Sequence, residues 1–503
     1  ELTGITYPFG SIGSLTKTPA GTLTDATWTV RTRIFTEALT RSQSGRIAAS
    51  QWADSTDATS PTQWSYTYDQ AGRLTQAILA AAGSRPQVTF GYDFSATGGC
   101  GADTNAGANG SRTNSSIQIG TGSAAASSYC YDDASRLTSI TGNNAISAAN
   151  ITYDAHGNAT KIGDQTFTYD SSDRVSGTSS TSTEQTLAYT RDSLGRVRIR
   201  IATGPETGMT RYGFAGASDN PDFQLTQTGG LAERYLTLPG GVLIAKNYST
   251  TTWKASVPNL HGDIAVQLAL NSDGTATTVE TGWVNDPFGQ PLDPSTAAVD
   301  LTALPSTRTG TGTTDSWLGK YQRGYEHTGG LNQILMGERT YLPSIGMFTS
   351  TDSLDGGNPT SYSYPVDPIN YADLDGAFPW ALPLIACGPV GWVALALVVV
   401  VAVVVLADAS DRSGFTQTVY DRSQDYRRSV VRRVAATVTI GIALMAEHTK
   451  GTRKSTEDKH TKKHSSRTGS KKQVENPNKG QRPQEKAAKA KAQEEAGKNR
   501  RRR

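Results

Sequence analysis

The sequence predicts a mainly β protein built from stacked β-hairpins. A helical apolar segment and a basic, largely disordered tail are expected to follow. A short tyrosine–aspartate motif recurs through the first half, residues 378–407 carry no charge, and Lys and Arg dominate residues 451–503. At 503 residues, the chain has room for a large repeat array.

The recurring motif places a tyrosine and an aspartate before a short polar segment. Copies read YTYDQAGRLT from Tyr66, YCYDDASRLT from Tyr129, ITYDAHGNAT from Ile151, FTYDSSDRVS from Phe167 and, more loosely, AYTRDSLGRVRIR from Ala188. Alternation before the aspartate predicts a strand with one buried face. The aspartate can cap its own backbone and glycine tolerates positive φ, so a tight turn should follow. Each copy therefore predicts one β-hairpin.

Such short hairpins cannot bury their own apolar faces, so we expect the copies to stack into a long curved sheet. The units resemble the YD repeats of the Rhs family, which also occur in insecticidal toxin-complex C subunits and in teneurins. The similarity covers residues 64–201, and less regular β-rich sequence continues to Trp317. The resemblance implies a hollow β-shell that encloses a C-terminal polypeptide.

Residues 337–376 resemble the core segment that follows the repeats in Rhs proteins. The family pattern reads GxRxYDPxxGRF, then SxDP, NxYxY and NPxNxxDPxG. The matching residues are Gly337, Arg339, Tyr341, Pro343, Gly346, Phe348, Ser350, Asp352, Asn358, Tyr362, Tyr364, Pro368, Asn370, Asp373 and Gly376. In the family, this segment forms a plug at the end of the shell.

The resemblance also implies self-cleavage after the core motif by an aspartyl-protease-like reaction. Asp352 and Asp373 are the candidate catalytic pair, and Ala377–Phe378 is the expected cut bond. Two carboxylates held close together cannot both ionise easily. One then polarises the scissile carbonyl as an acid, while the other activates water.

The chain departs from the family pattern at several positions. Leu342, Met347, Ser353 and Leu374 stand where the family has Asp, Arg, Pro and Pro. Loss of the arginine at Met347 removes a cation that would tune a carboxylate. The alternative is that Asp352 and Asp373 only cap turns in an inert plug, with Asp355 and Asp375 as nearby carboxylates that could replace them.

Cysteine and histidine residues suggest few further sites. Cys100 and Cys130 fit either a disulfide, which would suit an exported protein, or two free buried thiols. His261-Gly262-Asp263 is interpreted as a turn between strands rather than a ligand set. His460 and His464 are four residues apart among lysines and lack the HExxH glutamate. We expect no metal site and no cofactor.

The apolar run is expected to cross a membrane. Residues 392–407 read WVALALVVVVAVVVLA, and the uncharged stretch from Phe378 exceeds the roughly 20 residues that a spanning helix needs. The basic residues that follow would place the tail on the cytoplasmic side. In a shell-forming family, a second possibility is that the run stays sheltered until release.

The tail from residue 451 carries 18 Lys/Arg against 6 Asp/Glu, a net charge of +12. This leaves −9 for the rest of the chain, whose total is +3. Such a tail suits nucleic acid or anionic lipid, and the alternative is a solvated disordered extension. The hypothesis that the tail is a nuclease is supported only by this charge, because we find no set of acidic or histidine residues that could cut a phosphodiester.

The sequence therefore favours a polymorphic-toxin-type Rhs protein at the cell surface or secreted, whose shell encloses or presents a variable C-terminal effector. The alternative is a non-enzymatic, membrane-anchored adhesion protein. Expected partners are a target-cell membrane or envelope and an immunity protein. The expected parts are 1–63, a β-rich segment continuing from a missing N-terminal part; 64–316, the YD-repeat shell; 317–377, the core plug; 378–410, the transmembrane segment; and 411–503, the variable basic region.

Overall fold

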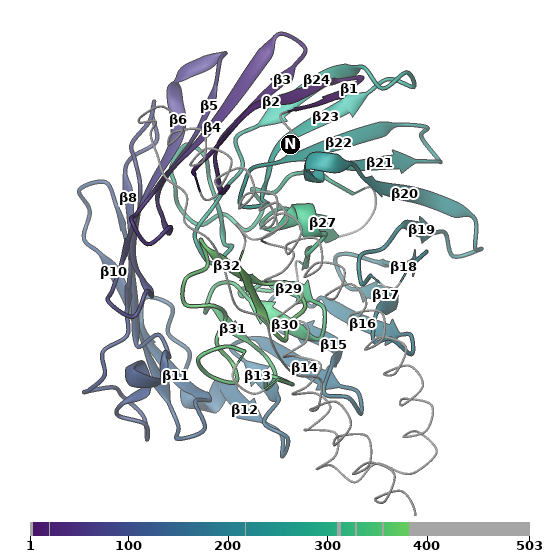
Figure 1. The fold of residues 1–503 in the computed structure, drawn as a ribbon. Helices are drawn as coiled ribbons and strands as arrows, with labels where there is room; N and C mark the ends of the chain where they lie inside the picture. The colour runs from purple at the N-terminus through teal and green to yellow at the C-terminus, as the bar shows by residue number, and fades with distance from the viewer. Residues whose placement is uncertain are drawn as a thin grey trace, which may run out of the picture. The chain divides into compact units, whose positions relative to one another are not determined.

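The computed structural model describes residues 4–381, apart from 20, 217, 309–312, 327, 328, 355 and 356. These residues form antiparallel strands joined by tight turns, so the predicted mainly β fold is confirmed (Figure 1). The predicted helical apolar segment was expected from residue 378, but Pro379–Ala381 form a strand that pairs with Tyr371–Asp373. The rest of that segment and the basic tail lie outside the described residues. Within the described part, no helix is long and apolar enough to span a bilayer.

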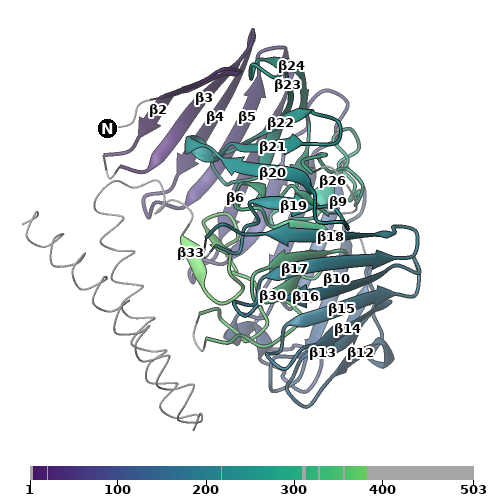
Figure 2. The same ribbon diagram turned by 90° about the vertical axis from the view of Figure 1, so that its right-hand side faces the viewer.

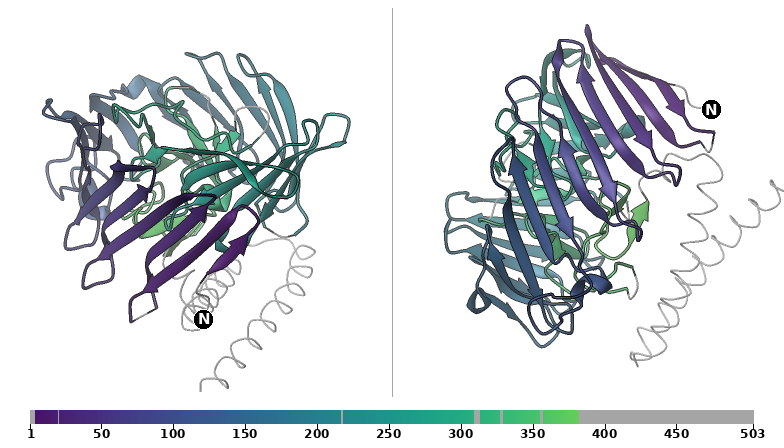
Figure 3. Two further views of the ribbon diagram at one scale, coloured as in Figure 1. Left: turned by 90° about the horizontal axis from the view of Figure 1, so that it is seen from above. Right: turned by 90° about the vertical axis from the view of Figure 1, so that its left-hand side faces the viewer.

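The first sheet follows the chain without a crossover. Among the described residues it has 11 strands, each paired with the next in sequence; they form the purple-to-blue wall at the right of Figure 3. The strands are β1 (Ile5–Tyr7), β2 (Gly10–Lys17), β3 (Leu23–Val30), β4 (Arg33–Arg41), β5 (Ile47–Asp54), β6 (Asp57–Tyr68), β7 (Leu74–Leu79), β8 (Val88–Asp93), β9 (Asn114–Ile119), β10 (Ala125–Tyr131) and β11 (Leu137–Gly142).

A second meander of 13 described strands continues the wall and is seen face-on in Figure 2. Its strands are β12 (Ile151–Tyr153), β13 (Ala159–Ile162), β14 (Gln165–Tyr169), β15 (Val175–Ser180), β16 (Thr186–Arg191), β17 (Val197–Thr203), β18 (Gly208–Gly213), β19 (Phe223–Leu225), β20 (Leu231–Thr237), β21 (Leu243–Asn247), β22 (Trp253–Pro258), β23 (Ile264–Leu270) and β24 (Ala276–Thr281).

One long sheet was expected, and the structure divides it in two between β11 and β12. Ile140 of β11 bridges to Ile146 in the connecting loop, so β11 pairs with a local partner rather than with β12. A 3₁₀ turn at Ala148–Asn150 then leads into β12. Strongly twisted open sheets rarely exceed about ten strands without splitting, and this loop is where the split occurs.

The YD motif forms the turn of a hairpin in each of its five copies. The aspartate N–H donates to the carbonyl four residues on at 2.9–3.0 Å, and its Oδ1 accepts that residue's N–H at 2.9–3.2 Å. The residue before that partner has positive φ: Gly72, Ser135, Gly157, Asp173 and Gly195. The predicted hairpins are therefore confirmed, and two copies use Ser or Asp where glycine is usual.

Three of the motif tyrosines join their hairpin to the one before it. Their hydroxyls donate to the carbonyl of the first residue in the preceding return strand: Tyr68 to Ile47 at 2.8 Å, Tyr153 to Leu137 at 3.0 Å and Tyr169 to Ala159 at 2.8 Å. The contact of Tyr153 with Leu137 continues this connection across the break between the sheets. The tyrosine thus supplies the contact between repeats that a lone hairpin lacks.

The far ends of the two sheets pack against each other. A buried cluster combines Trp28 and Phe35 of the first sheet with Val257 and Leu268 of the second. The Arg31 guanidinium donates to the Thr277 carbonyl at 2.8 Å. The first strands of one sheet are thereby fixed to the last strands of the other.

The remaining described residues, 284–381, form a central segment between the two sheets, green in the view from above (Figure 3). A buried cluster joins Leu74 and Phe90 of the first sheet to Trp317, Tyr341 and Phe348 of this segment. Its strands are β25 (Val284–Asn285), β26 (Pro291–Leu292), β27 (Thr313–Asp315), β28 (Gly324–Glu326), β29 (Gln333–Met336), β30 (Arg339–Leu342), β31 (Met347–Phe348), β32 (Tyr371–Asp373) and β33 (Pro379–Ala381).

Cys100 and Cys130 form a disulfide, which decides between the two alternatives left open by the sequence. Cys130 lies in β10, and Cys100 lies in the long connection between β8 and β9. The disulfide ties that connection to β10, the second-to-last strand of the first sheet. Cys387 lies outside the described residues.

Replacing both bonded cysteines in the variant Cys100→Ser/Cys130→Ser should destabilise the first sheet. The bond closes a sequence separation of 30 residues, and a cross-link of this length contributes about 3–4 kcal/mol by restricting the unfolded chain. Guanidinium unfolding of the variant and the wild type measures the loss. Thiol titration of the denatured, unreduced wild type should find one free thiol, and three would contradict the disulfide.

Candidate functional site

The candidate catalytic residues Asp352 and Asp373 lie close together in the central segment. Asp373 ends β32 and is completely buried, whereas Asp352 lies in the loop after β31 with a 5% exposed side chain. One nitrogen of Arg339, Nη2, lies 2.9 Å from Oδ2 of both aspartates. The structure therefore brings together two carboxylates that are 21 residues apart in sequence.

Arg339 is the centre of this arrangement. Its Nε donates to the Gly376 carbonyl, and its Nη1 donates to the Ser361 carbonyl at 3.1 Å. The guanidinium lies over the Phe348 ring, 3.7 Å from its centroid. A single buried cation thus holds both carboxylates and the chain leading to the expected cut bond.

Asn358 is a second donor between the aspartates. Its Nδ2 donates to Asp373 Oδ2 at 2.8 Å and lies 3.4 Å from Asp352 Oδ2. An amide has two N–H donors, so it can face both carboxylates without adding charge. Asn358 matched the core pattern, but its spacing did not reveal this role.

The expected cut bond lies directly against this pair. The N–H groups of Ala377 and Phe378 donate to Asp373 Oδ1 at 3.0 and 3.2 Å. Asp375 Oδ1 accepts the same two N–H groups at 3.2 and 3.1 Å. The backbone around Ala377–Phe378 is therefore clamped by two carboxylates, while Asp355 lies outside the described residues.

Gly376 allows the chain to reach this position. Its φ is +70°, and a Cβ there would lie 2.2 Å from the Met336 carbonyl oxygen. Any side chain at this position would push the Ala377–Phe378 bond away from β29. The glycine of the core motif thus meets a steric requirement.

The carbonyl side of the bond faces Asp352 across a space that Gly357 leaves open. A Cβ on Gly357 would lie 2.8 Å from the Ala377 carbonyl oxygen and 3.6 Å from Asp352 Oδ2. Burial raises the pKa of Asp352, and its contacts with Arg339, Leu354 and Asn358 oppose this only in part. Asp352, whose raised pKa favours the protonated form, therefore lies on the carbonyl side of the Ala377–Phe378 bond. Asp373 lies on the amide side of the same bond.

Met347 does not deprive the aspartates of their cation. Its side chain is buried, and its sulfur accepts a hydrogen bond from the Tyr131 hydroxyl at 3.9 Å. The cation on the carboxylates is Arg339, the first residue of β30. The effect of the missing arginine at position 347 on the pair stays a prediction.

The other core-motif residues anchor the segment to its surroundings. The Tyr341 hydroxyl donates to the Phe288 carbonyl at 2.8 Å. Asn370 Oδ1 accepts the Ile47 N–H of the first sheet at 3.0 Å. The Gly346 carbonyl accepts the Tyr364 N–H at 3.3 Å. These residues position the site and do not face the cut bond.

His261 connects the wall to the core motif. His261-Gly262-Asp263 lies in the turn between β22 and β23, as interpreted from the sequence. Nδ1 of His261 lies 2.9 Å from Asp263 Oδ1, and Nε2 lies 2.9 Å from the Pro368 carbonyl oxygen. Both ring nitrogens face acceptors, which favours the doubly protonated ring.

Within the described residues, no cluster of three or more His, Cys, Asp or Glu side chains could hold a metal ion.

The described residues define a fold class: two long antiparallel meanders around a central segment. No protein-family model matches the chain, and no curated protein matches it. Among solved structures, it is similar to TcdB2-TccC3 and to TcdB2-TccC3-Cdc42, each with 15% identity. The TM-scores are 0.53 and 0.52, over 74% and 73% of this chain.

The chain spans 19% and 18% of the length of those two chains. At this identity, the likeness shows a shared fold. It agrees with the mainly β fold of stacked hairpins that the YD motif led us to expect. The chemistry of the aspartate pair has to be argued from the residues of this chain.

We predict that His261 stabilises the fold most below neutral pH. Burial alone lowers the pKa of His261, but Asp263, the Pro368 carbonyl and Glu37 outweigh burial and raise it. Stabilisation from a raised pKa is complete below the unfolded value of about 6.5. It is lost as the pH rises through the folded value. At pH 6, His261→Gln should cost about 1.5–3 kcal/mol, as for a hydrogen bond to a charged group.

Denaturant unfolding of wild type and His261→Gln between pH 5.5 and 9 measures this difference. Glu37, with a pKa raised by burial to about 8, titrates in the same range, and Asp263 and Lys320 also face the site. His261 lowers the pKa values of Glu37 and Asp263, so the difference reports on the histidine together with these two neighbours. His156→Gln is the control: this exposed histidine also has a pKa raised by its partner Asp173, and solvent screening should make its pH-dependent effect much smaller. A difference that does not change with pH would contradict the prediction.

Proposed function

We propose that this chain is part of an Rhs-type toxin protein whose β-walls and central segment enclose or present a C-terminal effector beginning at Phe378. The proposal rests on the YD hairpins, the core-motif resemblance and the fold shared with TcdB2-TccC3. On this proposal the effector acts at a target-cell membrane or envelope, and an immunity protein protects the producer. The basic tail would engage nucleic acid or anionic lipid.

We further propose that Asp352 and Asp373 cut the Ala377–Phe378 bond. The observation that carries this is the 3.2 Å contact of Asp373 Oδ1 with the Phe378 amide nitrogen, while Arg339 holds Asp352 beside the same bond. On this proposal, the two carboxyl groups act as a general acid–base pair from either side of one peptide unit. Arg339 and Asn358 act as positioning residues.

In the proposed reaction, a water oxygen attacks the Ala377 carbonyl carbon. Asp373 accepts a proton from that water, and protonated Asp352 donates its proton to the carbonyl oxygen as the tetrahedral intermediate forms. Collapse of the intermediate breaks the C–N bond. The Phe378 nitrogen then takes the proton from Asp373, and Asp352 recovers its own. The products are a carboxyl group on Ala377 and an amine on Phe378.

Cleavage is tested by the intact mass of purified protein. The wild type should yield residues 1–377 and 378–503, and Asp373→Asn or Asp352→Asn should leave the chain whole. Asp273→Asn, at an exposed turn aspartate, is the control and should cleave like the wild type. Since Asp352 must be protonated and its pKa is raised, the rate should fall with increasing pH. A wild type that stays whole from pH 4 to 8 would contradict the proposal.

Gly357→Ala tests the geometry of the bond separately from the acids. The added Cβ would meet the Ala377 carbonyl oxygen at 2.8 Å and displace it, and a misplacement of about 1 Å costs on the order of 100-fold in rate. The time course of fragment appearance measures this effect. An unchanged rate would show that the carbonyl does not react from this position.

The effector role is tested by inducing residues 378–503 in a bacterial host, with and without an export signal. Growth arrest that a neighbouring gene relieves is the expected result. A fragment without effect in cytoplasm and periplasm would argue against a toxin even if cleavage occurs, which keeps the two proposals separable.

A further inference from the structure

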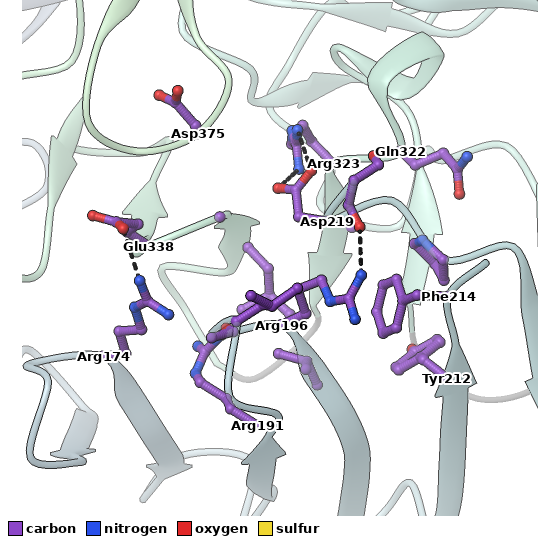
Figure 4. Close-up of a pocket in the computed structure, with 18 of the residues that line it drawn as sticks. Arg174, Arg191, Arg196, Tyr212, Phe214, Asp219, Gln322, Arg323, Glu338 and Asp375 are labelled. Carbon is purple, nitrogen blue, oxygen red and sulfur yellow. Dashed lines mark hydrogen bonds and ion pairs between the residues drawn. The ribbon is translucent and has the colours of Figure 1, made fainter. Parts of the chain in front are cut away.

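A cavity of about 340 Å³ lies between the second sheet and the central segment, and its lining includes Glu338, the neighbour of Arg339 in sequence, and Asp375. Its lining comes from the β16–β17 turn, from β18 and the loop after it, and from residues 308, 322–324, 335, 337, 338 and 375. Five described arginines line it: Arg174, Arg191, Arg196, Arg308 and Arg323 (Figure 4). Phe214 and Tyr212 form its apolar wall.

Four of these arginines have carboxylate partners. The ion pairs are Arg174 with Glu338 at 2.7 Å, Arg196 with Asp192 at 2.7 Å, Arg308 with Asp315 at 2.6 Å and Arg323 with Asp219 at 2.6 Å. These pairs hold the guanidinium groups in place around the cavity. The Arg196 guanidinium is also stacked on the Phe214 ring, 4.3 Å from its centroid.

Arg191 differs from the other four. Its Nη1 and Nη2 donate to the Gly195 and Val175 carbonyls at 2.9 and 3.1 Å. Within the described residues it has no carboxylate at ion-pair distance, and its Nε is buried without a hydrogen-bond partner. Burial and the nearby Arg174 charge lower the pKa of Arg191, and the charges of Asp170 and Tyr189 oppose this only in part. A partly buried cation next to a second cation is costly unless an anion lies between them.

Arg323, like Arg191, has an Nε that is buried without a hydrogen-bond partner in the described part of the chain. Guanidinium groups are planar donors that suit oxyanions, and phosphate above all, with two parallel hydrogen bonds. The volume is at the lower end of the range for small-molecule sites, so it suits a small anion better than a peptide.

We propose that this cavity binds a small multivalent oxyanion, a phosphate-bearing molecule or a polycarboxylate, through Arg191 and its neighbours. The anion would give Arg191 the directly contacting ion-pair partner that it lacks among the described residues. The cavity shares Asp375 with the contacts around the Ala377–Phe378 bond, but neither Asp352 nor Asp373 lines it, so anion binding can be tested whether or not the chain cuts itself.

Calorimetric titration of the full-length protein with inorganic pyrophosphate and, in a separate arm, citrate tests the proposal at constant ionic strength. We expect saturable binding of at least one anion to one site per chain, and the arm that binds identifies its class. Arg191→Gln should weaken the binding at least tenfold, because it removes the uncompensated charge.

Leu194 supplies a matched pair of variants that do not disturb the buried contacts. Its side chain is 61% exposed and lies at the rim of the cavity. Leu194→Glu should weaken binding several-fold by placing a negative charge at the entrance, and the neutral Leu194→Gln should not. If Arg191→Gln unfolds, this pair decides the question. Absence of saturable binding in both arms, or equal affinity of the Glu and Gln variants, would overturn the proposal.

Discussion

The buried guanidinium of Arg339 is the interaction on which the centre of this molecule depends. It contacts Asp352, Asp373 and the Gly376 and Ser361 carbonyls, which come from three different stretches of the central segment. Breaking a buried ion pair leaves an unpaired charge at a cost of about 3–5 kcal/mol. Because Arg339 pairs with two carboxylates, its removal would leave both Asp352 and Asp373 buried without a cation. The same contacts that make the segment fold also place the Ala377–Phe378 bond against Asp373.

The walls make this burial possible. Each YD turn is held by an aspartate and a backbone carbonyl four residues on, and three of the motif tyrosines reach the preceding hairpin. Tyr169 also donates to the Thr349 carbonyl at 3.0 Å, which ties the second sheet to the core motif. On the other side, Asn370 holds the Ile47 backbone of the first sheet. The central segment has little regular structure of its own, so its conformation depends on these contacts from both walls.

Much of the local structure could be predicted because it is encoded within a few residues. An aspartate, a residue that tolerates positive φ and a return strand suffice for each hairpin turn. The pairing of Asp352 with Asp373 was expected only through the resemblance to a family. The role of Arg339 was missed although its place in the motif was noted, because a motif gives positions and not contacts. Position 347 was considered instead, and its Met packs against Tyr131.

The sequence by itself determined the hairpins, their order and the interpretation of His261-Gly262-Asp263 as a turn, since each depends on neighbours within about five residues. The tertiary structure alone decided where the sheet divides, that Cys100 and Cys130 are bonded, and which cation meets which carboxylate. It also gathered Arg174, Arg191 and Arg323 around one cavity. The physical reason is that alternation along a strand specifies which face is buried, but not which distant strand or loop will cover that face.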